Sequence, residues 1–89
     1  MTMHDLKCWP DFFSATITGE KVAELRKDDR AFEPHDILCL KEWIGAGVGY
    51  TGREALARVT HVLRNAPGIV PKDYALLSIR LVSSTEATR

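Results

Sequence analysis

Three charged residues that could form a site, Lys21, Glu24 and Arg26, follow Gly19 closely. The segment 21–27 alternates like a short β-strand, which puts Glu24 and Arg26 on one face and Lys21 on the other. In one interpretation Lys and Arg bind a phosphate or a base edge, while Glu accepts a hydrogen bond from an exocyclic amine. In another, Lys21 and Glu24 form an acid and base pair, which requires Lys21 to lie in the turn before the strand. A solvated sheet edge explains the spacing equally well.

Four other residues extend this candidate site. Lys7, on an earlier strand, would add positive charge, although a single strand lysine is usually solvated. Arg30 could contact a phosphate, but pairing with the neighbouring acidic residues is favoured. Tyr50 and Arg53 follow the glycine-rich segment 45–49 and could stack a base and hold its phosphate. An ordinary hairpin shoulder accounts for these two residues as well.

Several conspicuous side chains are assigned to packing instead. Cys8 and Cys39 lie in apolar segments without a CxxC pair, so buried free thiols are expected, ahead of a disulfide. Trp9 and Trp43 are expected in the core or at its rim. His61 alternates with apolar residues and is predicted to be buried. Because the histidines and cysteines share no ligand spacing, we expect neither a metal nor another cofactor.

The overall composition is that of a small folded protein. With 89 residues, 45% hydrophobic and 27% charged, the chain is expected to form one domain over 1–89, with its core at 4–82 and a flexible tail at 83–89. A net charge of zero argues against binding long nucleic acids by charge alone. The sequence contains no membrane-length apolar run and begins without a signal-peptide pattern, so a cytoplasmic protein is expected, with a monomer slightly favoured.

Alternation and turn residues predict one early helix and several short strands. Proline and aspartate at 10–11 begin the helix and Gly19 ends it. The helix is predicted at 11–18, and the strands at 4–8, 21–27, 37–43, from 50 or 54 to 63, and 74–82. This order predicts an α+β fold that is mostly β: a small, mostly antiparallel barrel of five to six strands with one helix across an open end.

Gly19, Lys21, Glu24 and Arg26 also match the G-x-K-x-x-E-x-R signature of the ASCH domain family, which has a PUA-like fold. The chain resembles a compact subgroup from bacteria and phages over most of its length, from the first strand to Leu81. This resemblance implies a cleft between barrel and helix, lined by the signature Lys, Glu and Arg, that binds RNA or a nucleotide-like ligand.

The resemblance has two departures that matter below. Some ASCH proteins are amidohydrolases on N(4)-acetylcytidine, and that branch has Thr where Glu24 stands; others are described as ribonucleases. The compact subgroup usually has Gly where His35 stands. We therefore predict a binding domain for RNA or a nucleotide-like ligand. The alternatives are a small hydrolase that uses Lys21 and Glu24, and a protein-interaction module.

Overall fold

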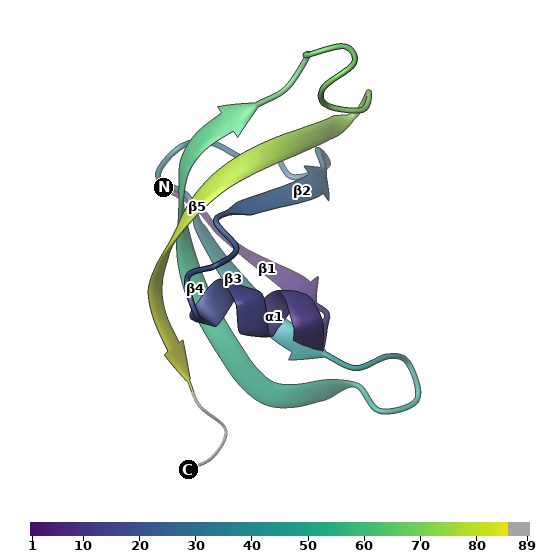
Figure 1. Cartoon of the computed structure of the whole chain (residues 1–89), viewed down its shortest axis with the longest axis vertical. Helices are drawn as coiled ribbons and strands as arrows, with labels where there is room; N and C mark the ends of the chain where they lie inside the picture. The colour runs from purple at the N-terminus through teal and green to yellow at the C-terminus, as the bar shows by residue number, and fades with distance from the viewer. Residues whose placement is uncertain (86–89) are drawn as a thin grey trace.

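The segments predicted as strands form a single sheet in the computed structural model, which describes residues 1–85 (Figure 1). The elements in chain order are β1 (Met3–Cys8), α1 (Pro10–Ile17), β2 (Ala23–Lys27), β3 (Ile37–Trp43), β4 (Tyr50–Leu63) and β5 (Tyr74–Thr85). The predicted α+β, mostly β fold is confirmed: five strands curl into a half-barrel accompanied by one short helix.

The order of strands across the sheet is β1-β3-β4-β5-β2. β1 pairs with β3 in parallel, and the other neighbours are antiparallel. β1 and β2 therefore form the two edges of the sheet, and its curl turns the edges toward each other (Figure 1). This arrangement is important for the site, because Lys7 and Arg26 lie on these two edge strands.

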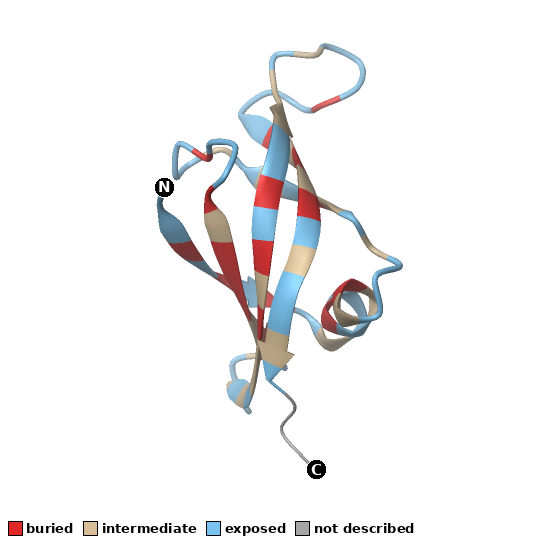
Figure 2. Ribbon diagram, turned by 90° about the vertical axis from the view of Figure 1, so that its left-hand side faces the viewer, coloured by how far each residue is buried: buried red, intermediate tan, exposed pale blue. Residues whose placement is uncertain are grey.

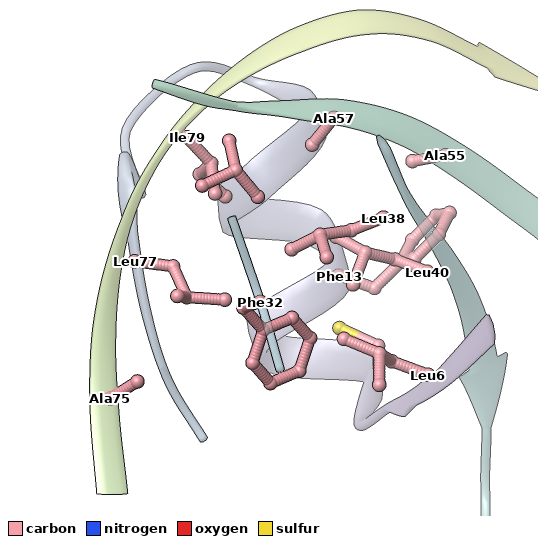
Figure 3. Close-up of a cluster of buried hydrophobic side chains, with 12 residues drawn as sticks. Leu6, Phe13, Phe32, Leu38, Leu40, Ala55, Ala57, Ala75, Leu77 and Ile79 are labelled. Carbon is pink, nitrogen blue, oxygen red and sulfur yellow. The ribbon is translucent and has the colours of Figure 1, made fainter. Parts of the chain in front are cut away.

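The core fills the inside of the curled sheet. Burial alternates along the strands, as expected for a sheet with one face packed and one face solvated (Figure 2). Phe13 of α1 and Phe32 of the loop after β2 are fully buried among aliphatic side chains of the strands (Figure 3). The helix packs against β3 and β5 through this face. Its burial explains why a helix of only eight residues, with β-branched residues at its end, is stable.

The helix ends as its sequence predicts, and its end sets the position of Lys21. Thr18 caps α1, and Gly19 follows with a φ of 84°, in the left-handed region that glycine adopts without strain. The amide of Lys21 then donates to the carbonyl oxygen of Ala15 at 2.9 Å. β2 begins only at Ala23, so the strand predicted at 21–27 is two residues too long at its start.

Two other predictions differ from the structure. His61, predicted to be buried, is exposed. In the β4 and β5 pairing Val59 is opposite Ile79 and His61 is opposite Ser78, so Thr60 is an extra residue in a bulge that reverses the alternation. β5 also continues to Thr85, three residues past the predicted strand end; positions 86–89 of the predicted tail lie outside the described residues.

A buried polar cluster holds the start of β1 to the turn before β3. His4 donates to Asp36 at 2.9 Å, and the amides of Thr2 and Glu33 donate to the same carboxylate at 3.0 Å each. Burial works to raise the pKa of Asp36, but these hydrogen bonds outweigh it and lower the pKa below its ordinary value. Because His4 and Asp36 satisfy each other, the pair serves the fold. In residues 1–85 no helix has the length and apolar character that a membrane span requires.

Candidate functional site

Glu24 lies between two cations at the edge of the sheet. The residue is only 6% exposed, because Glu24 is opposite Leu77 of β5 and points toward the core side. One oxygen, Oε1, contacts the Nζ of Lys21, and the other, Oε2, accepts from the Nε of Arg26 at 2.7 Å. Two cations on one carboxylate leave one positive charge in excess. We call Lys21, Glu24 and Arg26 the charged triad.

The contact between Lys21 and Glu24 depends on the turn before β2. On a regular strand the two side chains would point to opposite faces. Lys21 precedes the strand, and its Nζ also donates to the carbonyl oxygen of Ala23 at 2.6 Å, so the side chain folds back toward Glu24. Lys21 therefore lies in the turn before the strand, which is the position that an acid and base pair of Lys21 and Glu24 requires.

Two arginines cross from the β2 side to the open edge of β1. The Nη2 of Arg26 donates to the carbonyl oxygen of Lys7 at 2.6 Å. The Nη1 of Arg30 donates to the carbonyl oxygen of Asp5, also at 2.6 Å, and its Nε lies 3.6 Å from the Asp29 carboxylate. The local pairing expected for Arg30 is thus present, together with a contact to β1 that the sequence did not predict.

The charged triad lines a hollow beside the start of the helix, which we call the cleft. The cleft has a volume of about 480 Å³. Its wall carries the three triad residues, Lys7 and a group of largely apolar side chains: Cys8, Trp9, Phe12, Leu25 and Trp43. Four predicted site residues therefore meet in one hollow: Lys7, Lys21, Glu24 and Arg26.

Aromatic side chains give the cleft an apolar rim. The rings of Trp9 and Trp43 are 5.2 Å apart between centroids and are inclined by 59°. The Nζ of Lys7 lies 4.3 Å from the centroid of Trp43, a cation–π contact. Trp9 is 51% exposed, so the packing role expected for it holds only in part. The sequence could have indicated that Trp9 lies at the site, because Trp9 stands between β1, which carries Lys7, and α1, whose end positions Lys21.

The remaining predicted residues lie in two neighbouring hollows of about 290 Å³ each. The nearer hollow shares Lys7 and Arg26 with the cleft and adds Arg30, Lys41 and Tyr50. The farther one is lined by Asp5, Lys41, Tyr50, Gly52, Arg53 and Glu54. Arg30, Tyr50 and Arg53 therefore extend the site along β1 and β4, outside the cleft itself.

Another buried carboxylate, that of Glu42, lies beside this region and was missed in the sequence. It accepts a hydrogen bond from the hydroxyl of Thr51 at 2.7 Å, and the Nε of Arg53 is 3.4 Å from the same oxygen. The Arg53 guanidinium also lies 4.8 Å from the ring centroid of Phe13. The Nε of Arg53 is buried and makes no hydrogen bond to Glu42 at 3.4 Å, so this part of the side chain lies inside the fold and is not open to a ligand.

Both cysteines are buried free thiols, as predicted. Burial and the nearby carboxylate of Glu24 raise the pKa of Cys8 to about 11, against the opposing effect of Lys21 and Arg26. Burial and the neighbouring Glu54 also raise the pKa of the Cys39 thiol. Neither cysteine therefore has the thiolate character of a nucleophile. Across residues 1–85 no three His, Cys, Asp or Glu side chains cluster in a way that would hold a metal ion.

Another hollow, of about 510 Å³, lies where the β4 to β5 loop meets the residues after β2. Its main charged pair is Arg64 with Asp28, joined by two hydrogen bonds of 2.7 and 3.1 Å. Arg64 also donates to the carbonyl oxygen of Phe32 at 3.0 Å. This arginine is satisfied within the protein, and the hollow contains none of the predicted site residues, so we assign it a structural role.

Comparison with known proteins adds a family and one relative. Residues 3–79 match the model of a domain of unknown function, DUF3850. An uncharacterized 12.9 kDa protein in the GpA 3′ region of Escherichia phage P2 is 40% identical over 75 residues, which is 84% of this chain. The chain spans 65% of that relative's length. Because the family model covers most of the chain, including the whole charged triad, the protein belongs to the DUF3850 family.

Proposed function

We propose that this chain is an ASCH-like cytoplasmic domain that binds RNA or a nucleotide-like ligand in the cleft. One observation carries the proposal: three cations and an exposed indole line a single hollow around a carboxylate that holds two of the cations in place. A phosphate group binds to the cations and a base stacks on the aromatic rim, so the cleft has a surface for both parts of a nucleotide.

The charged triad keeps donors free for an anion. Lys21 has three N–H donors and uses two of them, on Glu24 and Ala23. Arg26 has five and uses two, on Glu24 and Lys7. With one positive charge in excess from the triad and another from Lys7, the cleft suits a phosphate group that carries one to two negative charges.

Trp9 supplies the surface for a base. One face of the neighbouring Trp43 is already covered by Lys7, whereas half of Trp9 is open to solvent. Stacking on an aromatic side chain contributes about 1 to 3 kcal/mol per base and is tolerant of sequence. In this arrangement the base lies on Trp9 and its phosphate lies toward Lys21 and Arg26.

Tryptophan fluorescence provides the test, because the chain has two tryptophans and both line the cleft. Titration with short single-stranded RNA is expected to quench the emission. Lys21→Ala and Arg26→Ala should weaken binding about tenfold each, a loss of about 1.4 kcal/mol per charge-assisted contact. Lys72→Ala removes the same charge from the β4 to β5 loop and is the matched control.

Two outcomes of the fluorescence titration would refute the proposed binding. If folded wild-type protein gave no quenching by RNA or by mononucleotides at low salt, the proposal would fail. Equal affinity for the wild type, the two cleft variants and Lys72→Ala would also contradict it. Circular dichroism melting of each variant separates a loss of binding from a loss of fold.

The contact between Lys21 and Glu24 supports a second candidate, a small hydrolase acting on a modified nucleoside or on RNA. Glu24 would take a proton from water while Lys21 stabilises the developing negative charge. Both Glu24 oxygens already accept a hydrogen bond from a cation, which favours the binding proposal over this one. Release of acetate from N(4)-acetylcytidine, or cleavage of single-stranded RNA, that disappears in Glu24→Gln would establish the hydrolase.

A further inference from the structure

We infer that the cleft is one end of a longer track and that its ligand is a single-stranded RNA whose backbone follows the open edge of β1, in preference to a mononucleotide. This inference rests on the proposed function and adds the class and length of the ligand. It starts from the two arginines that contact β1, Arg26 and Arg30.

The hollows along β1 are adjacent, because each shares wall residues with the next. The cleft and the next hollow share Lys7 and Arg26 in their walls. That hollow and the farther one share Asp5, Lys41 and Tyr50. In the proposed track a ligand leaves the cleft beside Arg26 and passes Arg30 toward Tyr50, from one hollow to the next. A single nucleotide would fill only the first part of this path.

The two arginines are spaced in a way that suits successive phosphates. Arg26 is attached to the carbonyl oxygen of Lys7 and Arg30 to that of Asp5, two residues earlier in the same strand. Two residues of a strand span about 6.6 Å, which is comparable to the separation of neighbouring phosphates in an extended nucleic acid strand. Each guanidinium is held by the backbone of β1 and keeps further N–H donors for an anion.

Aromatic and charged residues define the two ends of the track. Trp9 is half exposed at the cleft end, and Tyr50 is 55% exposed at the other. Lys41, beside Tyr50, lies 3.8 Å from Asp5 and 3.7 Å from Glu54, so its charge is largely balanced within the protein. The strongest phosphate contacts are therefore expected at Arg26 and Arg30, with a base stacked at each end.

The experiment measures affinity against ligand length. Uridine monophosphate and oligouridylates of two to eight nucleotides are titrated into wild-type protein by tryptophan fluorescence, at several salt concentrations. Affinity is expected to rise at least tenfold from the monophosphate to the chain that reaches Tyr50, and then to level off. Arg30→Ala should weaken the longer ligands several-fold more than it weakens the monophosphate, and should reduce the log–log salt slope of the longer ligands by about 0.7.

Arg80→Ala is the control, because this exposed arginine on β5 lies outside all three hollows. Equal affinity for the monophosphate and the longest oligouridylate would overturn the track and leave the proposed function intact. An Arg30→Ala variant whose affinity and salt slope match wild type would overturn it too. Failure of every ligand to bind would instead refute the proposed function, and the track with it.

Discussion

The guanidinium of Arg26 donates to the carbonyl oxygen of Lys7 over 2.6 Å, and this hydrogen bond joins the two edge strands of the sheet. β1 and β2 are at opposite ends of the strand order, so side chains must close the gap between them. Arg26 also donates to Glu24. One residue thus connects the charged triad to the strand along which we propose the ligand to lie.

Replacing Arg26 by lysine tests that connection. Lysine keeps the charge but lacks the planar fork that reaches Glu24 and the Lys7 carbonyl together. We expect Arg26→Lys to lower the free energy of unfolding by about 1 to 2 kcal/mol and to weaken RNA binding several-fold. Urea unfolding and fluorescence titration measure the two effects, with Arg80→Lys as the control. A variant as stable as wild type would mean that the sheet edges do not depend on this bridge.

Glu24→Gln tests how much the charge of Glu24 contributes to stability and to RNA binding. The amide keeps the shape but loses the charge that holds Lys21 and Arg26, so we expect a loss of about 2 kcal/mol in stability. Because the cleft gains a net positive charge, binding of short RNA at low salt should stay within about threefold of wild type. Isothermal calorimetry checks the affinity. A binding loss as large as that of Lys21→Ala would contradict this expectation and would mean that binding depends on the charge of Glu24.

Stability should fall in acid partly through Asp36. Its pKa is lowered in the fold, so its ionised form stabilises the protein above the ordinary carboxyl pKa, and that contribution is lost as pH falls below about 4. Asp36→Asn is expected to cost about 1 to 3 kcal/mol at pH 7. The difference in free energy of unfolding between wild type and Asp36→Asn, measured by urea unfolding, should become smaller toward pH 3. A difference in free energy of unfolding that stays constant with pH would exclude Asp36 as a source of the acid dependence.

His35 is a site where glycine should stabilise the protein. Its φ is 79°, in the left-handed region, and its side chain is exposed in the turn before Asp36. His35→Gly relieves that backbone strain and should raise the free energy of unfolding by about 0.5 to 1 kcal/mol, after the entropy that glycine adds to the unfolded chain. His35→Ala shortens the side chain without relieving φ and should give no gain in melting temperature.

Local sequence signals predicted the elements well, because each depends on neighbouring residues. Alternation located the strands, and Gly19 located the end of the helix. The errors arose where pairing with a distant strand intervenes. The bulge at Thr60, which exposes His61, is set by the register between β4 and β5 and has no local marker. The extension of β5 to Thr85 depends in the same way on its pairing with β4.

For the candidate site, the sequence by itself determined which residues carry the charge, because Lys21, Glu24 and Arg26 are close in the chain. Only the tertiary structure decided that Glu24 is buried between the two cations, that Trp9 faces the same cleft, and that Arg26 and Arg30 reach β1. The physical reason is that the curl of the sheet brings its two edges together, and these contacts join residues far apart in the chain.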